Sequence, residues 1–185
     1  DINLNAVKHN YNVIKKYCQK SEVSSTVKAS SYGIGGHNQI VKKLVKSGCK
    51  RFFVANINEG IFIRKKFKSI IINVLNGLNK NEEKVFHKYN LTPVINTITQ
   101  LRKWIKFNKN KNKLIIHFDT GMCRLGIQED KIGEVVKLKK ELDQYLTQLE
   151  EAEKEMEEAA KRLAENQPFH RFFEHHKPCT RSRHY

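Results

Sequence analysis

Residues 51–75, RFFVANINEGIFIRKKFKSIIINVL, contain one complete strand–helix–strand pattern. The runs 52–55 and 70–75 are rich in Val, Ile and Phe and are mostly apolar on both faces, as the buried strands of a parallel sheet are. Residues 58–67, between them, have the spacing of an amphipathic helix. Because parallel strands need a crossover connection, usually a helix, this stretch predicts a βαβ unit.

The same alternation extends in both directions along the 185-residue chain. Further strands are predicted at 27–29, 93–95 and 114–118, and a sixth at 2–4. Amphipathic helices are predicted at 5–19, 38–47, 81–89 and 97–107. Repeated βα units indicate an α/β fold. We expect a partial (β/α) TIM-type barrel, because a closed barrel of eight strands needs about 200 residues or more.

The composition changes near residue 133, after which the chain has no Ile. Residues 148–166, QLEEAEKEMEEAAKRLAEN, are nearly all strong helix formers with a thin apolar stripe. We therefore expect a partial β/α barrel over 1–146, an added C-terminal charged amphipathic helix over 147–167 and a basic, His-rich tail over 168–185. A solvated helix and a helix that seeks a partner both remain open.

Charge and cysteine content limit the function classes. The formal net charge is +16, and residues 1–132 hold the whole surplus. Such a charge is able to attract nucleic acid or anionic lipid. These lysines, however, are spread over most predicted elements and do not gather on one of them, which favours a solvated surface. We therefore expect no nucleic-acid partner. No run of 18 apolar residues predicts a membrane span. The four cysteines lack a Cys-x-x-Cys pattern, and we expect free thiols in a reducing cytoplasm.

Metal binding is not expected. The last stretch of the chain holds four possible ligands, namely His170, His175, His176 and Cys179. Their spacing matches no common zinc pattern, and no second cysteine pair is present. A frayed basic tail is the favoured interpretation.

Two stretches carry residues suited to chemistry. In 26–36, TVKASSYGIGG, Lys28 closes a predicted strand and precedes a glycine-rich turn. A lysine there is able to form a Schiff base with a carbonyl cofactor, while the glycines fit either a phosphate cradle or a turn that needs positive φ. In 118–126, FDTGMCRLG, Arg124 is able to donate hydrogen bonds to an oxyanion, or it lies on the surface beside an Asp/Thr turn.

Together these two stretches resemble the signatures of a known family. Residues 27–35, VKASSYGIG, are similar to VKANAYGHG, and residues 119–126, DTGMCRLG, are similar to DTGM-x-RLG. Both belong to the amino-terminal barrel domain of alanine racemase, a pyridoxal-phosphate (PLP) enzyme of fold type III. The resemblance covers about residues 2–146, in the order and spacing of that family.

This resemblance implies a mechanism and its residues. Lys28 would be catalytic, holding pyridoxal 5'-phosphate as an internal aldimine and exchanging a proton with one face of the alanine Cα. Tyr32 would bind the cofactor phosphate and Arg124 the cofactor's phenolic oxygen. The family interconverts L- and D-alanine for peptidoglycan, acts as a homodimer and brings an opposite-face tyrosine from a later domain.

Three departures from the family qualify that expectation. Asn3 replaces the Asp of the opening strand, Ser30 and Ser31 replace Asn and Ala, and His117 stands where many members have a lysine that helps hold the arginine. We expect this chain to be a truncated racemase, weakly active or inactive alone, for which dimerisation is doubtful. Two alternatives remain: a non-catalytic PLP-binding pseudoenzyme, and a basic binding module with a helical interaction arm.

Overall fold

The computed structural model describes residues 2–107 and 113–138, together with 154, 156–158 and 161. The chain falls into two compact units, Asp1–Thr147 and Gln148–Tyr185. In the second unit the described residues are helical. The predicted helix over 147–167 and the tail over 168–185, with its four possible metal ligands, otherwise lie outside the described residues.

Among the described residues of the first unit, five parallel strands form a sheet. They are β1 (Ser25–Thr26), β2 (Arg51–Val54), β3 (Ile71–Val74), β4 (Thr92–Ile95) and β5 (Ile115–Ile116). Each strand pairs with the next one along the chain, in the order β1-β2-β3-β4-β5. Sequential parallel pairing of this kind is the arrangement of a barrel wall, whereas a doubly wound sheet reverses its strand order.

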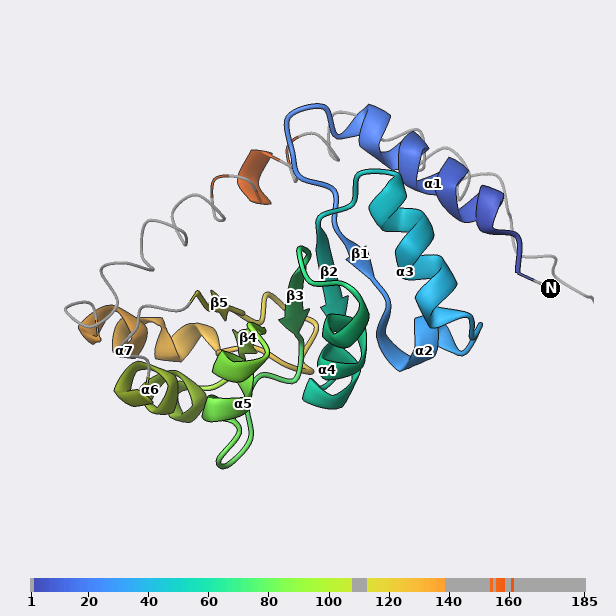
Figure 1. The fold of residues 1–185 in the computed structure, drawn as a ribbon. Coiled ribbons are helices and arrows are strands. Elements are labelled where there is room, and N and C mark those ends of the chain that lie inside the picture. The colour runs from blue at the N-terminus through green and yellow to red at the C-terminus, as the bar shows by residue number, and fades with distance from the viewer. Residues whose placement is uncertain (1, 108–112, 139–153, 155, 159–160, 162–185) are drawn as a thin grey trace, which may run out of the picture. The chain divides into compact units, whose positions relative to one another are not determined.

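Helices connect the strands (Figure 1). They are α1 (Leu4–Tyr17), α2 (Lys28–Tyr32), α3 (His37–Lys46), α4 (Ile57–Lys66), α5 (Glu83–Lys88), α6 (Ile98–Phe107) and α7 (Ile132–Lys137), with a short 3₁₀ turn η1 (Glu129–Lys131) before α7. The five helices predicted from apolar spacing are confirmed. In the described part of the chain, no helix is long and apolar enough to cross a membrane.

The core lies between the helices and one face of the sheet. Phe52 and Val54 of β2 and Ile72 and Val74 of β3 are fully buried on that face. Helix α4 packs closely there, because a Cβ added at Gly60 would lie 3.5 Å from Val74 Cγ2. The α/β prediction is therefore confirmed, and most apolar residues of these two strands are buried as expected, although Ile71 of β3 is exposed.

Two predicted strands are wrong or misplaced. Residues 2–4 form no strand: Asn3 is the N-cap of α1, where its Oδ1 accepts hydrogen bonds of 3.0 Å from the N–H groups of Asn5 and Ala6. The strand predicted at 27–29 lies earlier, at Ser25–Thr26. Val27 N–H still donates to Phe53 O, but the backbone then turns away from the sheet at Ala29.

Candidate functional site

Lys28 lies just beyond the end of β1, at the carboxyl edge of the parallel sheet. Its side chain is half-buried, and its Nζ lies 5.9 Å from the centroid of the Tyr32 ring. Tyr32 is 62% exposed. In barrel proteins the carboxyl ends of the strands carry the reactive groups. A primary amine beside a phenol offers a nucleophile for a carbonyl carbon and a hydrogen-bond donor for an anion.

The turn after Lys28 has an unusual backbone. Ala29, Ser30, Ser31 and Tyr32 all have φ between 50° and 60°, so α2 is a left-handed turn built from residues with side chains. Its N–H groups still bond four residues back, from Ser31 to Val27 O at 3.1 Å and from Gly33 to Ala29 O at 2.8 Å. Left-handed helix costs about 1–2 kcal/mol per residue. Strain of this kind is concentrated at functional sites.

Glu59 of α4 holds this turn from outside. Its Oε1 accepts a hydrogen bond of 2.8 Å from Ala29 N–H, and its Oε2 accepts one of 2.7 Å from Ala55 N–H at the end of β2. The half-buried carboxylate thus links the residue after Lys28 to the neighbouring strand. Asn56 separately caps α4 through the N–H of Glu59.

The glycines that follow serve backbone geometry. Gly33, Gly35 and Gly36 all have positive φ, and a Cβ at Gly36 would lie 2.5 Å from Ile2 Cδ1. The positive φ expected of this turn is confirmed, and the phosphate cradle stays a prediction. His37 then begins α3 and is buried. Burial lowers the pKa of His37, and the negative charge of Glu59 offsets part of this shift.

The second motif folds into an exposed loop around Asp119. The Asp119 carboxylate accepts hydrogen bonds of 3.0 Å from the N–H groups of Gly121 and Cys123, and these backbone donors lower its pKa. Gly126 has φ 118°, and a Cβ there would lie 2.6 Å from Asp119 N. An open cavity of about 560 Å³ lies against this loop. The predicted Asp/Thr turn is therefore present.

Arg124 is exposed within this loop. Among the described contacts, none joins Arg124 to Lys28 or Tyr32, and Arg124 does not line the cavity. The structure therefore brings together two of the three predicted site residues, Lys28 and Tyr32. The assignment of Arg124 to the same site stays a prediction.

His117 is tied to a neighbouring strand. Its Nδ1 lies 2.8 Å from the Oδ1 of Asn96, which follows β4. The Asn96 amide nitrogen already donates to Leu75 O and Val94 O, so its oxygen is the acceptor and His117 Nδ1 carries the proton. In the neutral ring the remaining acceptor is Nε2. At the position where many members of the resembled family have a lysine, this chain thus has His117, whose ring is oriented by Asn96.

Two of these contacts were missed from the sequence. Asn56 and Glu59 are spaced as in a capping box, which is a signal that sequence reasoning is able to use. That signal does not reveal that the carboxylate reaches Ala29, thirty residues earlier. The pairing of Asn96 with His117 depends on the alignment of β4 with β5, for which no local pattern exists.

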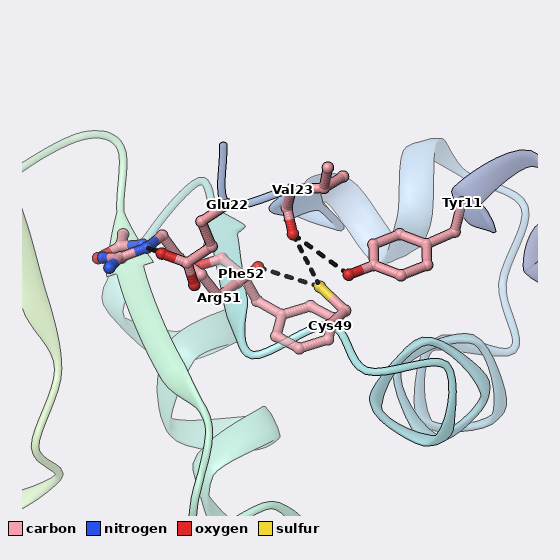
Figure 2. Close-up of polar contacts among 7 residues, drawn as sticks. Tyr11, Glu22, Val23, Cys49, Arg51 and Phe52 are labelled. Carbon is pink, nitrogen blue, oxygen red and sulfur yellow. Dashed lines mark hydrogen bonds and ion pairs between the residues drawn. The ribbon is translucent and has the colours of Figure 1, made fainter. Parts of the chain in front are cut away.

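A second polar cluster lies near the amino ends of β1 and β2 (Figure 2), whereas Lys28 follows the carboxyl end of β1. The Tyr11 hydroxyl donates to Val23 O at 3.4 Å, and the buried Cys49 thiol lies 3.3 Å from Arg51 O. Arg51 forms an ion pair with Glu22 at 3.0 Å. Burial raises the pKa of the Cys49 thiol, so the thiol stays protonated. This cluster ties α1 to the sheet and serves stability.

Comparison with known proteins places the chain in context. The family model described as "Alanine racemase, N-terminal domain" matches residues 2–152. The alanine racemase of Rickettsia prowazekii is 41% identical over 140 residues, which is 74% of this chain and 34% of that protein. The alanine racemase of Rickettsia typhi is 40% identical over 165 residues, which is 85% of this chain and 41% of that protein. The chain thus spans well under half the length of these relatives.

Solved structures give the same result for the fold. Alanine racemase from Bartonella henselae, whose structure has covalently bound pyridoxal phosphate, matches with a TM-score of 0.69 at 31% identity, over 74% of this chain and 40% of that one. Alanine racemase from Acinetobacter baumannii matches with a TM-score of 0.67 at 29% identity, over 75% of this chain and 40% of that one. The prediction of a partial barrel is therefore confirmed.

Proposed function

This chain belongs to the alanine racemase family through that family's N-terminal domain, and on this premise we propose that it holds pyridoxal 5'-phosphate through Lys28. One observation carries the proposal: the Lys28 amine is half-buried at the carboxyl edge of the sheet, beside the Tyr32 ring. The proposed reaction is the interconversion of L- and D-alanine.

The donor set of the site fits this cofactor. The cofactor has an aldehyde and a phosphate. A primary amine suits the aldehyde, and a phenol suits the phosphate; both are present on one turn, with Lys28 Nζ 5.9 Å from the Tyr32 ring centroid. When bound, the cofactor supplies an electron-accepting ring that stabilises negative charge at the substrate Cα.

Each residue then has a proposed task. Lys28 bonds to the cofactor and moves a proton to or from one face of Cα. Tyr32 donates a hydrogen bond to the phosphate, which suits a phenol that is 62% exposed. Arg124 donates to the phenolic oxygen of the cofactor. Racemisation also needs a proton donor on the opposite face, so we propose that this chain supplies one of two acid/base groups.

A second candidate function is cofactor binding without racemisation. This chain corresponds to 34% to 41% of the length of the two Rickettsia racemases, so racemisation by this chain is a separate proposal from cofactor binding. The two candidates share the Lys28 site and differ only in turnover. The cytoplasmic location and the supply of D-alanine for peptidoglycan stay predictions, and so does the expectation that dimerisation of this chain is doubtful.

The experiment is a titration of the protein with pyridoxal phosphate, followed by visible absorbance and by a racemase assay. We expect a new visible band in the wild type and its loss in Lys28→Ala. The matched control is Lys88→Ala, because Lys88 Nζ lies 5.6 Å from the centroid of the Tyr89 ring, the same arrangement at another place.

Three outcomes are distinguishable. A band that requires Lys28 together with turnover supports the racemase, and the same band without turnover supports the binding protein. A band that persists unchanged in Lys28→Ala, or that Lys88→Ala removes equally, contradicts the proposed site.

A further inference from the structure

The carboxylate of Glu59 contacts two segments outside its own helix. Its Oε1 lies 2.8 Å from Ala29 N and its Oε2 lies 2.7 Å from Ala55 N. Ala29 directly follows Lys28, and Ala55 directly follows β2, the strand that pairs with β1. Both oxygens thus accept charge-assisted hydrogen bonds from the backbone. This carboxylate connects the Lys28 turn to the sheet.

These contacts are not needed to start α4. The N-cap of α4 is Asn56, whose Oδ1 accepts from Glu59 N–H at 3.1 Å. In an ordinary capping box the glutamate would reach back to the N–H of the cap residue itself. Here the carboxylate extends past it to Ala55 and Ala29 instead. The side chain of Glu59 therefore does something beyond capping its helix.

The Lys28 turn needs an external support. Ala29, Ser30 and Ser31 are all held at φ of 50° to 59°, a conformation that residues with side chains rarely adopt. Such a conformation persists only where the surrounding structure fixes it. Ala29 is the first residue of the left-handed run, and its N–H is the group that Glu59 binds. The carboxylate thus binds the residue at which the backbone enters the left-handed conformation.

We propose that Glu59 is a positioning residue that fixes the direction of Lys28 by holding Ala29 N–H. The proposal rests on the proposed function, because it concerns the amine that would bond to the cofactor. It concerns the peptide next to that amine, and Glu59 itself takes no part in proton transfer.

The test is hydrogen exchange of individual amides in the protein without cofactor. In Glu59→Gln one carboxylate oxygen becomes an NH₂ group, so the side chain loses its charge and keeps one acceptor for the two amides. Any hydrogen bond that remains at Ala29 is then no longer charge-assisted. We expect the Ala29 amide to exchange about tenfold faster or more, as loss of a charge-assisted hydrogen bond implies. The Val27 amide, which bonds to Phe53 O in the adjacent ladder, should change far less.

The matched control is Glu83→Gln. Glu83 is also a first-turn glutamate, on α5, so its substitution removes the same charge from a helix amino terminus. A second variant, Glu59→Asp, keeps the charge but is one methylene too short to span both amides. The proposal predicts faster Ala29 exchange in Glu59→Asp as well, and unchanged exchange in Glu83→Gln.

A second readout links the contact to the cofactor. In Glu59→Gln and Glu59→Asp we expect half-saturation of the visible band to need about tenfold more pyridoxal phosphate, with Glu83→Gln at the wild-type value. Unchanged Ala29 exchange in both Glu59 variants, or equal acceleration at Ala29 and Val27, would overturn the proposal. A wild type that gives no band contradicts the proposed function instead, and the exchange data still test the contact.

Discussion

Ser30 illustrates how the site departs from ordinary backbone preferences. Its φ of 51° lies in the left-handed region, which glycine adopts readily and in which other residues are strained. The resemblance to the family signature located Lys28 and Tyr32, and the structure places them on the same turn. No pattern in the sequence predicted the left-handed conformation, because neither Ala29 nor Ser30 nor Ser31 is a residue that signals positive φ.

The strain at Ser30 gives a prediction. Ser30→Gly should raise the free energy of unfolding by about 0.5–1 kcal/mol, because relief of the left-handed strain exceeds the added entropy of the unfolded chain. Denaturant unfolding of the two proteins measures this change. Ser24→Gly is the control, since Ser24 precedes β1 and is absent from the residues with positive φ. A Ser30→Gly protein no more stable than Ser24→Gly would contradict the strain.

At the scale of elements, hydrophobic spacing predicted five of the seven described helices, although not their ends, and it did not predict α2 and α7. The pattern at 58–67 differs from α4 by one residue at each end. The strand predicted at 2–4 failed because its apolar residues flank Asn3, whose side chain caps a helix. Strand β1 has only two residues. The prediction placed it too late, at 27–29, because the apolar Val27 follows the strand. Short elements leave too few residues for periodicity to decide.

Arg64 joins two of these elements and is buried with 6% exposure. Its guanidinium donates to Phe67 O and Lys68 O after α4, and to Tyr89 O and Asn90 O between α5 and β4. The guanidinium therefore pairs four backbone carbonyls at once, which a lysine ammonium with three protons is unable to do.

We predict that Arg64→Lys lowers the free energy of unfolding by about 2–4 kcal/mol, because carbonyls are left without donors. Urea unfolding followed by circular dichroism measures the loss. Arg102→Lys is the control, since Arg102 is exposed and, among the described residues, its ion pair is with Glu134 at the surface. Equal effects of the two substitutions would show that the Arg64 contacts contribute nothing special.

At the scale of the whole molecule, the sequential parallel sheet places Lys28 at its carboxyl edge and the Tyr11–Cys49 cluster at the opposite end. The alternation of strands and helices predicted this architecture. The sequence did not predict contacts that cross between elements, such as Glu59 with Ala29 or Asn96 with His117, since these depend on how the βα units pack.

Acid stability is a property of the whole fold that His37 should influence. Burial holds the pKa of His37 below its ordinary value of about 6.5, so the unfolded chain binds this proton more readily than the folded one. The contribution of His37 is therefore fully present above about pH 6.5 and is lost as the pH falls through that value.

We predict that the stability of the wild type declines between about pH 7 and pH 5, and that His37→Gln declines less over the same interval. Unfolding free energies measured across this range, with pH 8 as the reference at which the ring is neutral, provide the comparison. Parallel curves for the two proteins would show that His37 does not titrate differently on folding.

The central claim is that one particular amine bonds to the cofactor, and reductive trapping tests it most directly. The protein is incubated with pyridoxal phosphate, reduced with borohydride, digested and mapped by mass spectrometry. We expect the label on the peptide that contains Lys28, and not on the peptide that contains Lys88. Labelling spread over the surface lysines with no preference for Lys28 would contradict the account.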